Sequence, residues 1–99
     1  MNILNSMKAK SIEKAEKLID IPNVGPRIAA DLVFLGYKKP KDLVGADGFK
    51  LYETLCKKTG VRHDPCVLDT FLAIADFVAG GPPRKWFKFT ALRKKKYKI

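Results

Sequence analysis

Residues 21–36 read Ile-Pro-Asn-Val-Gly-Pro-Arg-Ile-Ala-Ala-Asp-Leu-Val-Phe-Leu-Gly, and this stretch predicts a tight turn that leads directly into a short helix. Pro22 fixes one backbone angle, and Gly25 can adopt an N-cap or left-handed geometry that most residues avoid. Pro26 suits the first position of a helix, where no amide hydrogen is needed. Apolar residues then follow helical spacing up to Gly36, which we expect to end the helix.

The start of this helix is predicted to bind one phosphate group. The backbone amides of Gly25, Arg27 and Ile28 have no acceptor within the helix and lie at the positive end of its dipole. Amides arranged in this way form an anion-binding nest. Arg27 adds a mobile cation, and no acidic side chain lies within the turn to repel an anion.

The composition favours one small domain with a polyanionic partner. The 99 residues are 46% hydrophobic and 30% charged, which is typical of a compact globular protein. Residues 1–83 carry twelve Lys or Arg against ten acids, a net charge of +2, whereas residues 84–99 carry eight Lys or Arg and no acid. We therefore expect a helical domain over residues 1–83 and a basic, aromatic tail over residues 84–99 that packs on that domain or extends from it.

The sequence predicts a cytoplasmic protein that does not associate with membranes. No run approaches the roughly 18 apolar residues that are needed to span a bilayer. The first eight residues, Met-Asn-Ile-Leu-Asn-Ser-Met-Lys, lack the order of charged, apolar and small residues found in a signal peptide. We expect the protein to be a monomer.

Further helices are expected on both sides of the turn, and the strict alternation typical of strands is absent. Ser11, Asp47 and Asp64 are candidate N-caps, and Asp64 is followed by a proline suited to the first helical position. Besides the helix after Pro26, the expected segments are a helix over 11–20, a short connector over 40–45, and helices over 47–59 and 64–79. The predicted fold class is all-α.

The order of these elements repeats one unit, in which a helix, a turn and a second helix follow one another. The second turn, residues 59–65, reads Thr-Gly-Val-Arg-His-Asp-Pro and retains a glycine and a proline-started helix. Asp64 lies where an anion would approach. We therefore expect the first turn to bind and the second turn only to pack.

The sequence resembles three groups of known proteins. Residues 18–36 resemble the helix-hairpin-helix motif of DNA-repair and recombination proteins, an apolar-x-x-Gly-x-Gly-x-x-x-Ala pattern. The doubled arrangement resembles the C-terminal domain of TfoX-type competence regulators. Nearly the whole chain is similar to the small bacterial family of pathogenicity-locus or mitomycin-resistance proteins, through Leu-Tyr-Glu-Thr-Leu-Cys at 51–56, Gly60, Asp-Pro-Cys-Val-Leu-Asp at 64–69, Trp86 and Arg93-Lys94.

These resemblances imply a fold and a set of contacts. The implied fold is a five-helix tandem helix-hairpin-helix domain of the SAM-like kind with a basic C-terminal tail. Sequence-independent contacts to the DNA backbone are implied at Asn23, Gly25, Arg27 and Ile28. A monovalent cation is implied on the carbonyls of Ile19, Ile21 and Val24, and no other cofactor is expected. Asn23 departs from the motif, which usually has a glycine there, although asparagine tolerates left-handed geometry better than most residues.

The tail over residues 84–99 mixes aromatic residues with cations in the manner of single-strand binders. We expect Trp86, Phe87 and Phe89 to hold the tail on the helical core. Cations further along are expected to stay solvated and to contact phosphates: Arg93, Lys94, Lys95 and Lys96.

The residue pattern favours neither a metal site nor catalysis. Cys56, His63 and Cys66 lack a fourth ligand and the usual zinc spacings. The acids lie singly, without a pair suited to metal-assisted cleavage. Packing roles are favoured for both cysteines, with a redox disulfide as the alternative, and the helix dipole could lower the pKa of the Cys66 thiol.

The sequence therefore predicts a non-enzymatic, largely sequence-independent DNA-binding module. In this interpretation the 21–28 hairpin positions the DNA and the basic tail contributes affinity. A protein-interaction adaptor is the alternative, with the near-neutral residues 1–83 as the docking surface for a protein partner.

Overall fold

The structure is a computed structural model that describes residues 8–99, and every regular element in that range is helical. This confirms the all-α prediction. The elements are η1 (Ile12–Lys14), η2 (Leu18–Asp20), α2 (Pro26–Phe34), η3 (Pro40–Leu43), α3 (Gly48–Thr59), α4 (Pro65–Val78), η4 (Trp86–Phe89) and α5 (Thr90–Tyr97). Residues 8–99 thus contain four α-helices rather than the five expected. The first seven residues, on which the prediction of no signal peptide largely depends, lie outside the described range.

The prediction of a helix over residues 11–20 is wrong, because this segment forms two separate turns of 3-10 helix. Ser11 lies at the N-cap of η1 but makes no side-chain capping bond. The Asp20 carboxylate accepts hydrogen bonds from the amides of Glu16 and Lys17, at 3.1 and 2.8 Å. These bonds compete with a continuous helix, since they leave the backbone around Ala15 and Lys17 extended.

Helix α2 begins and ends where its sequence predicts. Gly25 is the N-cap and Pro26 takes the first helical position. At the other end Gly36 has φ 102°, and its amide donates to Val33 while the amide of Tyr37 donates to Leu32. This pair of bonds closes the helix in the manner expected of a glycine stop.

The two longest helices, α3 and α4, start at aspartate caps as predicted. The Asp47 carboxylate accepts from the amides of Phe49 and Lys50, and the Asp64 carboxylate accepts from the amide of Cys66. The start of α3 lies very close to α4, since a Cβ added at Gly48 would be 2.9 Å from the Leu72 Cα. A glycine is therefore required where the two helices meet.

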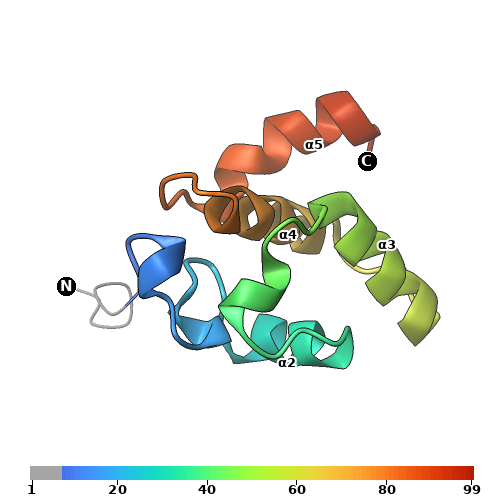
Figure 1. Cartoon of the computed structure of the whole chain (residues 1–99). Coiled ribbons are helices and arrows are strands. Elements are labelled where there is room, and N and C mark those ends of the chain that lie inside the picture. The colour runs from blue at the N-terminus through green and yellow to red at the C-terminus, as the bar shows by residue number, and fades with distance from the viewer. Residues whose placement is uncertain (1–7) are drawn as a thin grey trace.

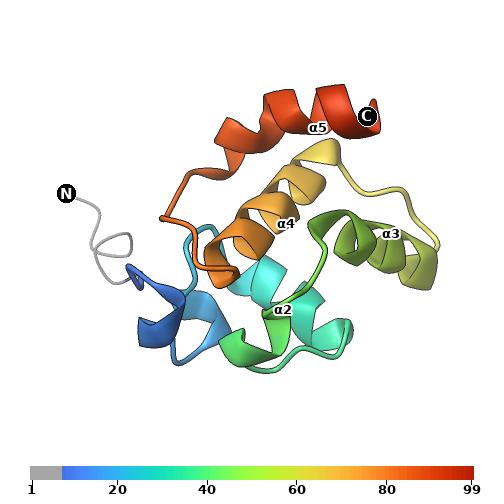
Figure 2. The same ribbon diagram turned by 45° about the horizontal axis from the view of Figure 1, so that its top comes forward.

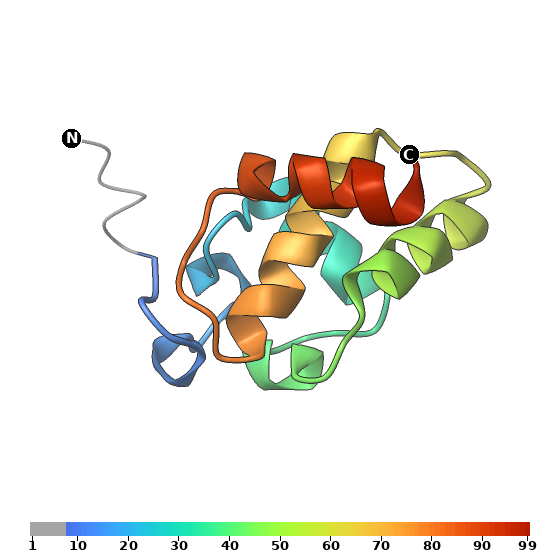
Figure 3. The ribbon, with the colours of Figure 1, turned by 90° about the horizontal axis from the view of Figure 1, so that it is seen from above.

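Helix α4 lies at the centre of the molecule, between α5 on one side and α2 on the other (Figure 1, Figure 2). Its fully buried side chains include Leu68, Phe71 and Ile74. Figure 3 shows α5 crossing over α4. Residues 86–97 are thus helical and pack on the core rather than forming an extended tail. Phe89 is the residue of η4 whose side chain is buried.

Within residues 8–99, no helix combines the length and apolar character needed to cross a membrane.

Candidate functional site

The turn before α2 is held by buried side chains on its inner side and is open to solvent at Gly25. Ile21 and Val24 are fully buried, and the amide of Val24 donates to the carbonyl of Ile21. The positive φ in this turn belongs to Asn23, at 74°, whereas Gly25 is extended at φ −98°. A Cβ added at Gly25 would meet no atom within 4 Å, so the space in front of the turn is free.

The amides predicted to bind phosphate have no protein acceptor within residues 8–99. The first bond of α2 runs from the Ala29 amide to the Gly25 carbonyl, and no described residue accepts from the amides of Gly25, Arg27 or Ile28. The Arg27 side chain is exposed beside them. The geometry of this turn is therefore suited to an anion, as its sequence predicts.

The carbonyls assigned to a monovalent cation are already occupied by other groups. The Lys8 ammonium donates to the carbonyls of Ile19 and Val24, both at 2.5 Å, and the Ile21 carbonyl accepts from the Val24 amide. Burial lowers the pKa of Lys8, and the nearby Asp20 carboxylate partly opposes that shift. These residues do not fit an added metal ion, because a lysine ammonium already lies in its place.

Asn23 joins the turn to a segment more than 60 residues away. Its side-chain nitrogen donates to the carbonyl of Arg84 at 2.7 Å, and its side-chain oxygen accepts from the amide of Trp86 at 3.1 Å. Residues 84–86 therefore lie against the turn, which brings Arg84 and Lys85 to it. This contact could not be predicted from the sequence, because nothing in a local pattern pairs residues so far apart.

The aromatic residues of the C-terminal segment divide into two groups. Phe89 is buried, as expected of a residue that holds the segment on the core. Phe87 is 53% exposed, against the prediction that it packs on the core, whereas Trp86, at 36%, is only partly exposed. Their rings meet edge to face with centroids 5.9 Å apart, and the Lys88 ammonium lies 5.9 Å from the centre of the Phe87 ring.

The four cations expected on the tail do not share one environment. Lys94, Lys95 and Lys96 are exposed, as predicted. Arg93 is only 6% exposed, and its Nε donates to the buried Asp69 carboxylate at 2.7 Å. Arg93 is therefore removed from the set of phosphate contacts, because its charge is neutralised inside the fold.

The structure brings part of the predicted site together. The Asn23 hydrogen bonds join the 21–28 turn to residues 84–88, and we call these two segments together the turn-strap surface. The far end of α5 lies elsewhere, since the Tyr97 ring stacks on Phe49 at the start of α3 with centroids 4.3 Å apart. Lys94, Lys95 and Lys96 thus form a separate basic patch.

The cysteines lie in environments that differ from each other. Cys66 is exposed, and its hydrogen bond to Asp64 raises the pKa of the thiol, which is opposite to the lowering expected from the helix dipole. The Cys56 sulfur is half-buried and accepts from the amide of His63 at 3.4 Å. Residues 8–99 contain no group of three His, Cys, Asp or Glu side chains that could hold a metal ion.

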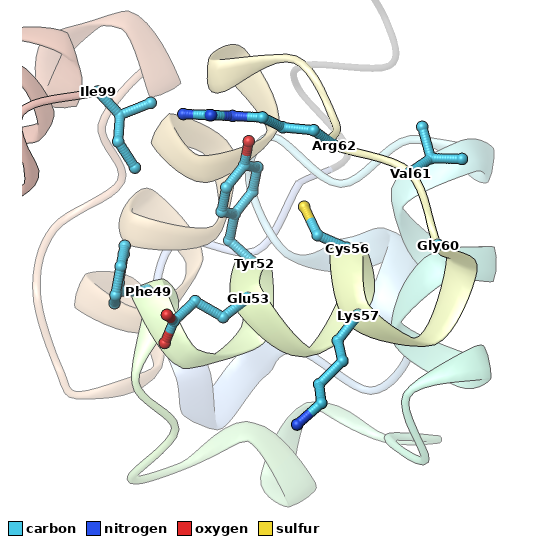
Figure 4. Close-up of a pocket in the computed structure, with 9 residues that line it drawn as sticks. All are labelled: Phe49, Tyr52, Glu53, Cys56, Lys57, Gly60, Val61, Arg62 and Ile99. Atoms are coloured by element: carbon cyan, nitrogen blue, oxygen red, sulfur yellow. The ribbon is translucent and has the colours of Figure 1, made fainter.

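A pocket of about 570 Å³ lies between α3, the loop after it and the end of the chain (Figure 4). Tyr52 and Cys56 form part of its wall, and Arg62 and Ile99 lie at its edge. Burial and the neighbouring Cys56 raise the pKa of the Tyr52 hydroxyl, which donates to the carbonyl of His63. Tyr52 and Cys56 thus both contact the backbone of His63, and the pocket is open to solvent.

The fold and this surface define a small all-α protein with a strongly basic C-terminal segment. The chain belongs to the Cdd1 pathogenicity-locus family, whose sequence profile matches residues 11–95. It is also 35% identical over 78 residues to a mitomycin resistance protein of Streptomyces lavendulae, McrB, a match that covers 79% of this chain and 74% of the relative. No solved structure matches the chain.

Proposed function

We propose that this protein is a non-enzymatic DNA-binding module that contacts backbone phosphates largely without regard to sequence. The observation that carries the proposal is the set of open amides at Gly25, Arg27 and Ile28, held beside the cationic residues Arg84 and Lys85 by the Asn23 bridge. Open amides at a helix start and flexible cations next to them are complementary to one phosphate and its neighbours.

The charge distribution supports this proposal. Residues 84–99 contain no acid, and every basic residue in them except Arg93 is exposed. The basic patch over Lys94–Lys96 adds cations at a second place on the surface. A duplex that touched both places would release several counterions, and its affinity would fall steeply with salt.

We further propose that the fold is a degenerate tandem helix-hairpin-helix arrangement of the SAM-like kind. The first unit is reduced, because η2 replaces its leading helix. In the second turn the Asp64 carboxylate already accepts from the Cys66 amide. That amide is therefore unavailable to an anion, which agrees with one binding turn and one packing turn.

Fluorescence anisotropy of a labelled DNA duplex, measured across a range of salt concentrations, tests the function. Gly25→Glu brings a carboxylate close to the amides, and its Cβ would meet no atom within 4 Å. We expect this variant to remain folded and to lose most of its affinity. Thr54→Glu, on an exposed position of α3, makes the same change in charge away from the site and should have little effect.

The basic patch is tested by the triple substitution Lys94→Gln, Lys95→Gln and Lys96→Gln. Because each duplex phosphate contact contributes a slope of about 0.9 on a log-log plot of affinity against salt, losing three contacts should flatten the slope by roughly 2.7. Absence of binding by the unaltered protein at low salt would overturn the proposal.

A protein-interaction adaptor is the second candidate, and one observation favours it. Val33 and Phe34, at the end of α2, are 51% and 53% exposed and lie next to each other in the chain. Exposed apolar side chains of this kind are common at docking surfaces. A protein that binds no DNA at low salt but loses a protein partner on Phe34→Ala would fit this function.

The similarity to McrB of Streptomyces lavendulae suggests an effect of this protein that can be measured in cells. McrB is named as a mitomycin resistance protein. We propose the same contribution here, through DNA binding. Cells that express this chain should then survive mitomycin better than cells that express Gly25→Glu at an equal level.

A further inference from the structure

The turn-strap surface carries two large aromatic side chains that the fold leaves partly exposed. Trp86 is 36% exposed and Phe87 53%, whereas Phe89, two residues further on, is buried. Phe89 and Arg93 provide the contacts that hold this part of the chain on α4, so packing does not account for the two exposed rings. Large exposed rings lying side by side are typical of binding surfaces.

The backbone that carries these rings is hydrogen-bonded to the turn. The Trp86 amide donates to the Asn23 side chain, and Asn23 precedes the open amide of Gly25 by only two residues. The same side chain holds the carbonyl of Arg84. The Trp86 backbone is therefore held close to the place where a phosphate would lie.

The charge around the rings points to a nucleic acid rather than to an apolar partner. Arg84, Lys85 and Lys88 flank the two aromatic residues, and residues 84–99 contain no acid. The Lys88 ammonium lies 5.9 Å from the centre of the Phe87 ring. Alternating cations and aromatic rings bind a strand by neutralising its phosphates and stacking on its bases.

A base can stack on such a ring only when its face is free. In a duplex the flat faces of the bases are covered by their neighbours, whereas single-stranded segments leave them open. The turn can therefore hold a phosphate of either form. The aromatic residues add contacts only to an unpaired base.

We propose that the turn-strap surface is a binding site for single-stranded DNA, in which the turn amides hold a backbone phosphate and the Trp86 ring stacks on an adjoining unpaired base. The Phe87 ring, nearly perpendicular to that of Trp86, contacts the edge of that base or a neighbouring one. This inference rests on the proposed function and names its preferred substrate. DNA with a single-stranded tail should bind more tightly than blunt duplex, because the tail supplies the base that the aromatic rings require.

Trp86 is the one tryptophan of the chain, so its fluorescence reports directly on this site. The probes are an oligothymidylate single strand, a blunt duplex, and the same duplex with an oligothymidylate tail. We expect the single strand and the tailed duplex to quench the fluorescence and the blunt duplex to leave it nearly unchanged. Quenching by the blunt duplex alone would overturn the inference.

Substitutions separate stacking from phosphate binding. Trp86→Ala should weaken binding of the single strand by roughly 10-fold, since stacking on one aromatic ring has an effect of this order. Trp86→Phe, which keeps a ring, should retain most of the affinity. Phe34→Ala is the matched control for Phe87→Ala, because both rings are 53% exposed and Phe34 lies at the opposite end of α2 from the turn.

The results of these experiments distinguish the single-strand stacking site from the proposed DNA-binding function on which it rests. If Gly25→Glu abolishes binding while Trp86→Ala and Phe87→Ala leave single-strand affinity unchanged, the stacking site is wrong and the phosphate site stands. If no DNA binds the unaltered protein at low salt, both proposals fail. Loss of single-strand preference in Trp86→Ala, with duplex binding retained, would support the inference.

Discussion

Asn23 shows how one residue can serve the backbone and a distant segment together. Its φ of 74° is one that asparagine tolerates, and its side chain both donates to Arg84 and accepts from Trp86. A glycine, usual at this position in the motif that the turn resembles, would satisfy the backbone but could not make the bridge. The departure from that motif therefore has a structural reason.

The variant Asn23→Gly tests this bridge. Glycine removes both hydrogen bonds but relieves the positive φ, so we expect a net loss of only about 1 kcal/mol in the free energy of unfolding. The Trp86 amide should lose its protection in a hydrogen-exchange experiment. Unchanged exchange at Trp86 would contradict the bridge.

Arg93 is a buried cation that the sequence alone does not distinguish from the exposed lysines that follow it. It lies in a run of four basic residues, but its position on α5 faces Asp69 of α4. The Asp69 carboxylate is fully buried and accepts from both Arg93 and the hydroxyl of Thr90. Burial of this kind depends on which face of the helix meets the core, and the short polar pattern of 90–97 does not reveal that face.

Removing one partner of this pair should destabilise the fold strongly. Asp69→Ala leaves the Arg93 guanidinium buried without an acceptor, which costs about 3–5 kcal/mol in comparable cases. Urea unfolding measures this loss. The double variant Asp69→Leu with Arg93→Met should recover much of it, because no buried charge is then left alone; equal stability of single and double variants would contradict this account.

At the scale of helices, the close approach of α3 to α4 depends on Gly48, which has a hydrogen atom where other residues have a Cβ. Gly48→Ala should destabilise the protein by roughly 1–3 kcal/mol although alanine favours helix formation, because its Cβ would lie 2.9 Å from the Leu72 backbone. Urea unfolding again provides the measurement. Thr54→Ala, exposed on the same helix, is the control and should be neutral or slightly stabilising.

The aspartate cap of α4 makes part of the stability depend on pH. The Cys66 amide, as a hydrogen-bond donor, holds the pKa of Asp64 below its ordinary value of 3.8. Because the folded-state pKa is depressed, this contribution is present above pH 3.8 and is lost as the pH falls through the folded-state value.

Asp64→Asn should therefore reduce the acid sensitivity of folding. Asparagine keeps a side-chain oxygen for the cap but cannot be protonated in this range. The measurement is the urea midpoint of both proteins above and below pH 3.8. The difference between the two proteins should shrink as the pH falls; a constant difference would contradict a role for Asp64 ionisation.

For the molecule as a whole, local signals in the sequence predicted local structure well. The caps at Asp47 and Asp64, the proline start of α2 and the glycine stop at Gly36 are all confirmed, because each depends on residues within one turn of the helix end. The helix expected over 11–20 was wrong, since Asp20 captures amides that a helix would need.

The long-range part of the site was not predictable in the same way. The amides of the turn could be named from the sequence, but the Asn23 bridge and the Lys8 ammonium on the turn carbonyls join segments through tertiary packing. Periodicity carries no information about such pairs. The charge distribution led us to expect a basic tail over residues 84–99 that packs on the domain or extends from it, and the structure has η4 and α5 there.

A chain that ends at residue 83 should therefore fold poorly. It lacks Phe89 and leaves the buried Asp69 carboxylate without Arg93 and Thr90. We expect loss of a cooperative urea transition, whereas a chain ending at residue 97, which keeps η4 and α5, should unfold cooperatively. A stable, cooperative fragment over residues 1–83 would show instead that the C-terminal segment is a separate addition.

The Asn23 bridge also sets an order of events during synthesis. The turn leaves the ribosome 61 to 63 residues before its partners Arg84 and Trp86. At about 5–20 residues per second, that interval lasts about 3–12 s. During this time the nascent chain carries the 21–28 turn without residues 84–88, which complete the turn-strap surface. The newly made protein therefore acquires its full surface only after residues 84–86 have been added and can reach Asn23.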